Sequence, residues 1–206
     1  MQLPRIYPIT DVQLSGLSHP DQVELLSRGG ATLIQLREKH MPAREFYDQA
    51  KIAFRPGVQL IINDRVDVAL AVGAHGVHLG QDDMPPEAAR KLLGPDAIIG
   101  YSTHNMEQAI AATKLPIDYL ALGPIFATTT KTDTAPVLGL EGLRVVRQMI
   151  GSFPLVAIGG ITHANAREVI QAGADSVAVI SAVLADSGRI PEATRSLLQA
   201  LQDFPR

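Results

Sequence analysis

Charged side chains directly follow several short apolar runs of this sequence, and their spacing suits the binding of an anion and a cation. In QLREK, the side chains of Gln35, Arg37 and Lys39 alternate, so they share one side of an extended segment. Asp64 ends the run QLIIND, and Asp83 follows the run GVHLG. Arginine and lysine neutralise phosphate groups, and two carboxylates with no Cys or His pair nearby suit Mg²⁺ better than Zn²⁺. These residues therefore predict a metal-bound diphosphate.

A second group of residues is suited to a separate phosphate. The segment FATTTKTDTAP, from Phe126 to Pro136, collects hydroxyl groups around the ammonium group of Lys131, which could also face the diphosphate. The glycine pair in VAIGG leaves backbone N–H groups open to close approach, and the run SVAVIS ends in a serine. The residues that match a phosphate monoester site are Gly159, Gly160, Ile180 and Ser181, and Thr128, Thr129 and Thr130 supply hydroxyl groups beside Lys131.

Each of these patterns also has an ordinary structural explanation. A charge run such as REK is usually solvated, ND often begins a turn, and QDDMPP is a good helix cap. Among the histidines, His78 lies in an expected strand where a packed, hydrogen-bonded ring is the usual role, His19 gives no signal, and His104 fits either a helix start or a site. No serine has an obvious histidine partner by spacing, so the sequence shows no nucleophile with its base.

Eight short β-branched runs alternate along the chain with segments of helical periodicity. The runs are IYPIT, TLIQLR, QLIIND, GVHLG, AIIGYS, DYLALG, PLVAIG and SVAVIS. This alternation implies parallel strands, and the nearly continuous apolar character of the runs implies burial on both faces. Closing eight such units gives an α/β fold of the (β/α)8 TIM barrel type. A doubly wound open sheet is the alternative, but it would more naturally carry a glycine-rich turn where the sequence has PITDVQLSG.

The barrel gives the polar clusters a common location. The loops after its strands form one face, and that face carries the chemistry. QLREK follows the second run, Asn63 and Asp64 the third, GQDD the fourth, and YSTH with Ser102 the fifth. The threonine segment, the glycine pair and Ser181 follow the sixth, seventh and eighth runs. The fold would therefore gather at one mouth residues that are scattered in the sequence.

Composition sets the limits of this interpretation. The chain has 206 residues, 46% of them hydrophobic, which is enough for one substantial core and predicts a single domain spanning residues 1–206. A net charge of −3 without any Lys/Arg cluster argues against nucleic acid or anionic lipid as a partner. The chain has no Cys, no signal peptide and no apolar run that could span a bilayer, so we expect a cytoplasmic protein without a membrane partner. The sequence allows a homo-oligomer but does not specify one.

The ordered set of motifs resembles the thiamine phosphate synthase (thiamine-phosphate pyrophosphorylase) family. The likeness extends from YPITD to VISAVLAD and is carried by QLREK, INDRVDVALAVGAHGVHLGQDDMP, GYSTH, LALGPIFATTTK and AIGGIT. The resemblance implies a (β/α)8 barrel that joins 4-amino-5-hydroxymethyl-2-methylpyrimidine diphosphate to 4-methyl-5-(2-phosphooxyethyl)thiazole. The products would be thiamine phosphate and pyrophosphate. Diphosphate would leave first, and the thiazole nitrogen would attack the resulting carbocation beneath a lid formed by the loop after the sixth strand.

The resemblance also implies a role for each site residue. The pyrimidine diphosphate would contact Gln35, Leu36, Arg37, Glu38, Lys39, Asn63, Ser102 and Lys131. Arg37, Lys39, Ser102 and Lys131 would be the catalytic residues among them, and Asp64 and Asp83 would hold Mg²⁺. The thiazole phosphate would contact Thr128, Thr129, Thr130, Gly159, Gly160, Ile180 and Ser181.

Three other functions fit the same scaffold. A thiazole tautomerase would bind the thiazole phosphate and move protons, with His104 as a candidate acid or base, but it would not need the full diphosphate set. A non-catalytic sensor of a phosphorylated ligand belongs to a different class, since fold alone does not fix function. A phosphate-binding isomerase or decarboxylase is the third alternative.

Overall fold

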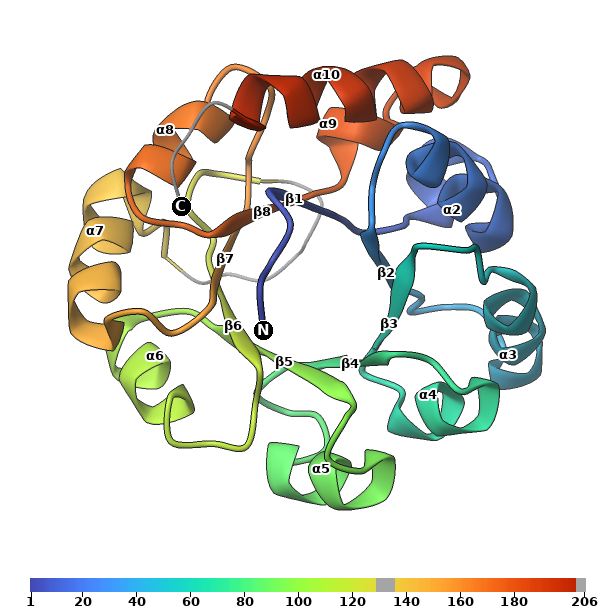
Figure 1. Ribbon diagram of the computed structural model, residues 1–206, viewed down its shortest axis with the longest axis horizontal. Coiled ribbons are helices and arrows are strands. Elements are labelled where there is room, and N and C mark those ends of the chain that lie inside the picture. The colour runs from blue at the N-terminus through green and yellow to red at the C-terminus, as the bar shows by residue number, and fades with distance from the viewer. Residues whose placement is uncertain (129–135, 203–206) are drawn as a thin grey trace.

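A computed structural model of the chain describes residues 1–128 and 136–202, and its centre is a ring of eight strands (Figure 1). The strands are β1 (Ile6–Pro8), β2 (Leu33–Leu36), β3 (Gln59–Asn63), β4 (Gly76–Leu79), β5 (Ile98–Thr103), β6 (Tyr119–Leu122), β7 (Leu155–Ile158) and β8 (Ser176–Val179). All neighbouring strands pair in parallel, in the order β1-β8-β7-β6-β5-β4-β3-β2. A single parallel bridge between Ile9 and Gln35 joins β1 to β2, so the barrel is nearly closed. The predicted parallel TIM-type barrel is confirmed, and the open doubly wound sheet is wrong.

Helices surround the strands on the outside of the barrel (Figure 1). The helices are α1 (Val12–Ser15), α2 (His19–Arg28), α3 (Ala43–Ile52), α4 (Val66–Val72), α5 (Pro86–Leu93), α6 (Met106–Ala112), α7 (Gly139–Ile150), α8 (Ala166–Gln171), α9 (Ser181–Leu184) and α10 (Ile190–Gln202), with a 3-10 turn η1 (Ser187–Arg189). The segments of helical periodicity that alternate with the β-branched runs form the longer helices, α2 to α8 and α10. Periodicity cannot reveal α1 and α9, because four residues span little more than one helical turn.

Aliphatic strand residues and two tyrosines fill the barrel. Nearly all residues of the eight strands are buried, as expected for strands covered on both faces. The rings of Tyr7 and Tyr119 meet edge-on inside, with centroids 5.8 Å apart. In a chain with only 4% aromatic residues, these two tyrosines have the largest of the fully buried side chains that the structure describes.

Two arginine–aspartate pairs fasten the end of the barrel where the strands begin. In the first, Arg90 of α5 donates to Oδ2 of Asp118 at 2.7 Å, and the same oxygen accepts the backbone N–H of Ile99 at 2.8 Å. In the second, Arg147 of α7 donates to Oδ2 of Asp175 at 2.6 Å. Each arginine also donates to several loop carbonyls, among them Gly94, Pro95, Ala97 and Pro116 for Arg90 and Gly151, Phe153 and Gly173 for Arg147. This end of the barrel is therefore built for stability, and the opposite end is left for chemistry.

We expect Arg147→Met to lower the free energy of unfolding by about 2 kcal/mol, because several carbonyls lose their hydrogen-bond donor. The ion pair itself adds little, since the Asp175 side chain is half-exposed. The melting temperature should fall by roughly 4–8 °C with unchanged KM values. The control is Arg144→Met on the same helix, which removes only an exposed pair with Glu141. Equal melting temperatures for the two variants would contradict this role of Arg147.

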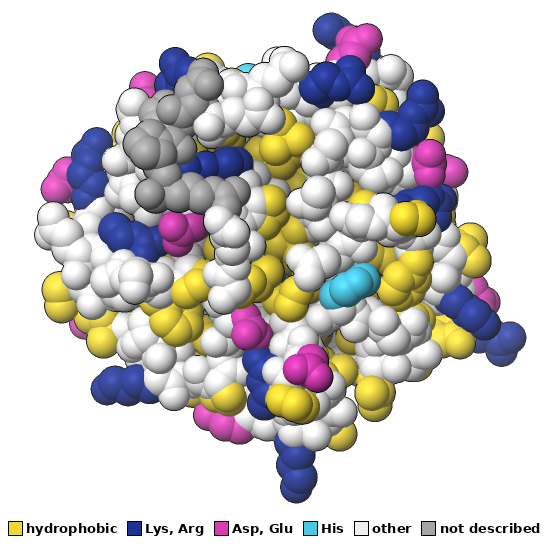
Figure 2. All heavy atoms as spheres, viewed as in Figure 1, with side chains coloured by type: hydrophobic (Ala, Val, Ile, Leu, Met, Phe, Trp, Pro, Cys, Tyr) yellow, Lys and Arg dark blue, Asp and Glu magenta, His cyan; other side chains and the backbone are white. Residues whose placement is uncertain are grey.

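The surface is mixed in charge. In Figure 2, lysine and arginine side chains alternate with acidic ones around the rim of the visible face, and no broad area of one sign forms there. Within residues 1–128 and 136–202, no helix is both long and apolar enough to cross a membrane.

Candidate active site

The carboxyl ends of β2 to β5 open into a pocket of charged and amide side chains, here called the charged pocket. Its lining residues are Arg37, Lys39, Asn63, Asp64, His78, Gly80, Gln81, Asp82, Asp83, Ser102, His104 and Gln108. Because parallel strands present their carboxyl ends at one edge, residues far apart in sequence meet here. The structure thus brings together the predicted residues Arg37, Lys39, Asn63, Asp64, Asp83 and Ser102.

The centre of the charged pocket is a contact between Asp64, Asp83 and Lys39. Asp64 adopts a left-handed backbone conformation, with φ of 60°, directly after β3. This conformation is uncommon for a residue other than glycine, but aspartate tolerates it, and such backbone strain is concentrated at functional sites. The ammonium group of Lys39 contacts Oδ2 of Asp64, and Asp64 and Asp83 share a hydrogen bond. Oδ2 of Asp83 also accepts the backbone N–H of Gly80 at 2.7 Å.

The two carboxylates influence each other's protonation. Burial raises the pKa of Asp83, and the neighbouring Asp64 raises it further. Burial also acts to raise the pKa of Asp64, but hydrogen bonds with Lys39 and Asp83 outweigh it, so that pKa is lowered. Two carboxyl groups in contact need a proton or a cation between them.

This donor set fits Mg²⁺. The ion typically takes one or two carboxylates and completes its shell with water and phosphate oxygens. In the described residues no group of three or more His, Cys, Asp or Glu forms a closed cage for a metal. The two aspartates therefore match a cation that shares its coordination with a bound phosphate.

The QLREK segment separates into residues that face the pocket and residues that support it. Arg37 and Lys39 line the charged pocket. Leu36 is fully buried, and Gln35 turns into the barrel, where its Nε2 donates to the hydroxyl of Tyr7 at 3.0 Å. The structure does not place Gln35, Leu36 or Glu38 among the lining residues of this pocket.

Glu38 instead folds back onto its own loop. Its Oε1 accepts the backbone N–H groups of Lys39, His40 and Met41 at 2.8, 2.7 and 3.1 Å. Its other oxygen lies 3.4 Å from Nε2 of His19, which is fully buried at the start of α2. Burial would raise the pKa of Glu38, but these backbone hydrogen bonds outweigh it and the pKa is lowered. The charged form of Glu38 therefore holds the loop that carries Lys39.

His19 extends this support to the seam between β1 and β2. Its Nδ1 lies 2.7 Å from Oγ1 of Thr10, and that oxygen accepts the backbone N–H of Arg37 at 3.2 Å. The backbone N–H of Thr10 in turn donates to the carbonyl of Gln35 at 2.9 Å. Burial lowers the pKa of His19 despite the nearby Glu38, so the ring is neutral at pH 7. The histidine without a sequence signal is thus one of the buried groups that position QLREK.

We expect Glu38→Ala to raise the KM for the predicted diphosphate substrate about tenfold, because three backbone N–H groups lose a charged acceptor and the loop loosens. The control is Glu38→Gln, whose amide oxygen can still accept these hydrogen bonds, and its KM should stay within about threefold of wild type. Steady-state kinetics at saturating second substrate measure both. Equal losses in the two variants would instead assign the Glu38 charge a direct role toward the substrate.

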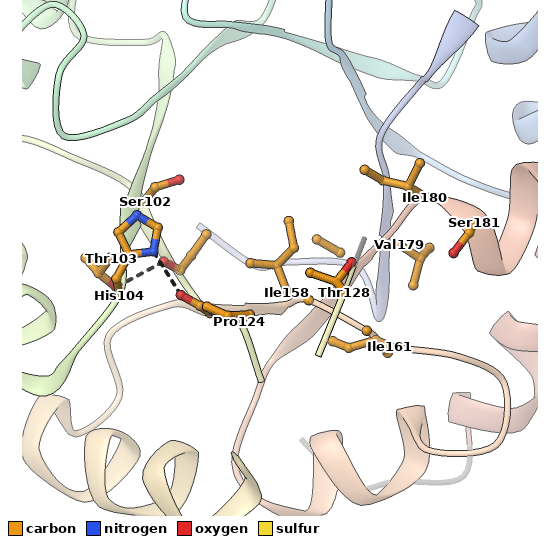
Figure 3. A pocket seen from close by; sticks show the side chains of 15 residues that line it. Ser102, Thr103, His104, Pro124, Thr128, Ile158, Ile161, Val179, Ile180 and Ser181 are labelled. Atoms are coloured by element: carbon orange, nitrogen blue, oxygen red, sulfur yellow. Dashed lines mark hydrogen bonds between the residues drawn. The ribbon is translucent and has the colours of Figure 1, made fainter. Parts of the chain in front are cut away.

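A second pocket, here called the glycine pocket, opens at the carboxyl ends of β5 to β8 (Figure 3). Its lining residues are Ser102, Thr103, His104, Ala121, Gly123, Pro124, Thr128, Ile158, Gly159, Gly160, Ile161, Ala178, Val179, Ile180 and Ser181. Ser102 and His104 lie on one side of it and Ile180 and Ser181 on the other, as Figure 3 shows. The predicted residues Thr128, Gly159, Gly160, Ile180 and Ser181 are therefore brought together. Strand β8 ends at Val179, and Ser181 begins the short helix α9.

The glycine pair is required by close backbone contacts. Gly159 and Gly160 have φ of 102° and 62°, which side chains rarely adopt. A Cβ at Gly159 would lie 2.6 Å from Cα of Pro124, and one at Gly160 would lie 2.5 Å from the carbonyl oxygen of Ala127. The glycines thus allow the loops after β6 and β7 to pass against each other at the edge of this pocket.

Ser102 and His104 line both pockets, so the two pockets adjoin. Nδ1 of His104 lies 2.9 Å from the carbonyl oxygen of Gly123, and the backbone N–H of His104 donates to Gln108. Nε2 of Gln81 donates to the carbonyl of Ser102. The sequence did not predict Gln81 or Gln108, because amides in a loop and in a helix carry no motif. The predicted Thr129, Thr130 and Lys131 lie outside the described residues.

Comparisons with known proteins agree with this geometry. The family model described as thiamine monophosphate synthase matches residues 6–183. The thiamine-phosphate synthase of Chloroflexus aurantiacus is 53% identical over 186 residues, covering 88% of this chain and 85% of the relative. The chain belongs to the thiamine-phosphate synthase family. It is an enzyme of that family, as the resemblance of the sequence motifs predicted.

Two further comparisons support the assignment. The thiamine-phosphate synthase of Koribacter versatilis is 51% identical over 195 residues, covering 90% of this chain and 92% of the relative. The solved structure of the thiamine phosphate pyrophosphorylase from Pyrococcus furiosus superposes with a TM-score of 0.85 at 42% identity, covering 97% and 96% of the two chains. Likeness of this extent over almost the whole chain confirms the family and the barrel together.

Proposed function

We propose that the charged pocket binds 4-amino-5-hydroxymethyl-2-methylpyrimidine diphosphate and the glycine pocket binds 4-methyl-5-(2-phosphooxyethyl)thiazole. The observation that carries this proposal is that the two pockets adjoin at Ser102 and His104. Each pocket has features suited to one anionic group, so two phosphorylated substrates can meet end to end. The reaction joins them into thiamine phosphate and releases pyrophosphate, as expected of a thiamine-phosphate synthase.

The charged side chains of the charged pocket suit it to binding the diphosphate and promoting its departure. Arg37 and Lys39 lie at its edge and are suited to the diphosphate, the arginine through a bidentate contact. Asp64 and Asp83 would hold Mg²⁺, which supplies charge neutralisation of the departing diphosphate. Lys131, which lies outside the described residues, would add a further positive charge there. Asn63 and Ser102 would orient the pyrimidine, and Gln35, Leu36 and Glu38 would contribute through the position of the strand and loop that carry Arg37 and Lys39.

The glycine pocket is suited to binding a phosphate monoester. Gly159 and Gly160 place backbone without side chains at its edge, and the loop into α9 adds Ile180 and Ser181. Barrel enzymes frequently bind phosphate at the loops after strands seven and eight. Thr128 borders this pocket in the described part of the chain, and we assign Thr129 and Thr130 the same role. The apolar lining at Ile158 and Val179 suits the thiazole ring.

The chemistry needs no general base to form the new bond. The carbon–oxygen bond to the diphosphate breaks first, and its electron pair leaves with the diphosphate. The lone pair of the thiazole nitrogen then forms the carbon–nitrogen bond with the pyrimidine carbocation. Arg37 and Lys39 neutralise the leaving charge, and the adjoining pockets position the nucleophile. This agrees with a sequence that shows no nucleophile paired with a base.

The alternative functions would need only one of the two pockets. A thiazole tautomerase or a sensor would need the glycine pocket, but neither explains why Arg37, Lys39, Asp64 and Asp83 gather in the charged pocket. The close relatives described above are also thiamine-phosphate synthases.

The experiment that tests the proposal incubates the protein with both substrates and Mg²⁺ and measures thiamine phosphate and pyrophosphate. The expected result is equimolar formation of the two products. Thiazole isomerisation or proton exchange without either product would overturn the proposal in favour of a tautomerase. Binding of the thiazole phosphate without any turnover would overturn it in favour of a sensor.

A further inference from the structure

A continuous line of hydrogen-bonded side chains crosses the barrel interior and ends at Ser102, one of the two residues that both pockets share. It begins at Gln35 on β2, whose Nε2 donates to the hydroxyl of Tyr7 at 3.0 Å. The hydroxyls of Tyr7 and Tyr119 lie 2.8 Å apart, and the hydroxyl of Tyr119 lies 3.0 Å from Nδ1 of His78. Nε2 of His78 then lies 2.8 Å from Oγ of Ser102. The line thus joins side chains from five strands, in the order β2, β1, β6, β4 and β5.

The line has a direction, which follows from the donors at its start. The Nε2 of Gln35 can only donate, so the hydroxyl of Tyr7 accepts there and has one proton left to place. Within the described residues the only other partner of this buried hydroxyl is Tyr119, and an unpaired buried proton is unfavourable. Tyr7 therefore donates to Tyr119. By the same reasoning, Tyr119 donates its single proton to Nδ1 of His78.

Both tyrosines keep the protons that this direction requires. Burial raises the pKa of the Tyr7 hydroxyl above its ordinary value, more than its hydrogen bonds lower it. Burial also raises the pKa of the Tyr119 hydroxyl, and the adjacent Tyr7 acts in the same direction. Both hydroxyls are therefore neutral donors at physiological pH.

A glycine makes room for the middle of the line. Gly100 on β5 lies beside Tyr119 and His78 in the strand register. A Cβ at Gly100 would lie 2.1 Å from Cζ of Tyr119 and 2.5 Å from Nδ1 of His78. The missing side chain therefore leaves the space in which the tyrosine hydroxyl and the imidazole meet. The stacked arrangement of the two rings, with centroids 5.6 Å apart, depends on the same space.

We propose that Tyr7, Tyr119 and His78 are positioning residues that hold His78 as the Nε2–H tautomer and so fix the polarity of the Ser102 hydroxyl. Nδ1 of His78 accepts from Tyr119, which places the imidazole proton on Nε2, and Nε2–H donates to Oγ of Ser102. The proton of the serine hydroxyl then points to a ligand with an acceptor atom, such as a ring nitrogen. The ligand part of this inference rests on the proposed function of the charged pocket.

The tautomer of His78 can be determined by NMR in the absence of substrate. Long-range ¹H–¹⁵N correlation spectra of ¹⁵N-histidine-labelled protein distinguish a protonated ring nitrogen from an unprotonated one. The His78 resonances are assigned by their loss in His78→Asn. The expected result is a proton on Nε2 and none on Nδ1. A proton on Nδ1, or on both nitrogens, at neutral pH would overturn the inference.

Kinetics of Tyr119→Phe test the consequence for Ser102. This variant keeps the ring but removes the donor to Nδ1, so kcat/KM for the pyrimidine diphosphate should fall about tenfold. The KM for the thiazole phosphate should stay within about twofold, which a general loss of structure would not produce. The control is Tyr47→Phe, which removes a hydroxyl on α3 outside both pockets and should leave the kinetics unchanged. Wild-type kinetics in Tyr119→Phe would overturn the inference.

The two measurements also separate this inference from the proposed function. If the wild-type protein formed no thiamine phosphate, the proposed function would fail, whereas the His78 tautomer would still be decided by the spectra. If the condensation proceeded but the proton lay on Nδ1, the proposed function would stand and the positioning inference would be wrong.

Discussion

Asp64→Asn lowers kcat by about 10²- to 10³-fold, the expected loss when one group that stabilises developing charge is removed. Asparagine has nearly the shape of aspartate and tolerates the left-handed backbone conformation found at this position. The substitution therefore removes the charge with little change in the fold. It also leaves Lys39 without its carboxylate partner and Asp83 as the only anionic ligand of the predicted pair.

The response to Mg²⁺ distinguishes a metal ligand from a residue that only orients Lys39. In Asp64→Asn, the Mg²⁺ concentration that gives half-maximal rate should rise about tenfold or more, because the ion keeps one carboxylate ligand from the chain. The control is Asp67→Asn, which removes an exposed carboxylate paired with Arg65 outside the pocket. An unchanged Mg²⁺ dependence in Asp64→Asn would contradict the assignment of this residue as a ligand.

Gly160→Ala raises the KM for the thiazole phosphate by at least tenfold, since backbone strain and displaced neighbours together cost more than about 1–2 kcal/mol. The added Cβ would lie 2.5 Å from the carbonyl oxygen of Ala127 and 2.8 Å from Cβ of Phe126. The loops after β6 and β7 must then separate, and the edge of the glycine pocket moves with them. The KM for the pyrimidine diphosphate should change much less, because Gly160 does not line the charged pocket.

Substitution of a second glycine with a similar φ distinguishes the effect of backbone strain from the effect of the steric clash at Gly160. Gly73, at the end of α4, has φ of 68°, close to the 62° of Gly160, but a Cβ there would meet no atom within 4 Å. Gly73→Ala should therefore cost about 1 kcal/mol of stability and leave both KM values unchanged. Thermal unfolding and steady-state kinetics of the two variants provide the comparison. A similar rise in KM for both would show that strain alone is responsible and would contradict the role given to the Gly160 contact.

The parallel barrel and the gathering of the candidate site residues at one face could be predicted from the sequence because both follow from local patterns. Apolar β-branched runs mark the strands, and parallel strands bring the residues after them to one face. The sequence therefore predicts Arg37, Lys39, Asp64, Asp83 and the glycine pair at one mouth, and the structure divides them between two adjoining pockets.

The supporting residues could not be predicted in the same way. The roles of His19 and His78 depend on contacts with Glu38, Tyr119 and Ser102, which come from other strands and loops. Such contacts leave no spacing in the sequence, because they join side chains that are distant along the chain.

Glu38 illustrates the same limit within a recognised motif. Alternation in QLREK indicates which side chains share a side, but it does not reveal that the Glu38 carboxylate turns back to three backbone N–H groups. Helix α9 could not be predicted for a different reason, because its four residues are too few to show helical periodicity.

The central claim is that the two substrates occupy separate, adjoining pockets, with the metal and diphosphate on one side. A crystal structure with thiamine phosphate, pyrophosphate and Mn²⁺ in place of Mg²⁺ tests this most directly. The account predicts an anomalous Mn²⁺ peak at Asp64 and Asp83, pyrophosphate beside Arg37 and Lys39, and the phosphate of thiamine phosphate at Gly160. Pyrophosphate bound at the glycine pair, or Mn²⁺ away from both aspartates, would contradict it.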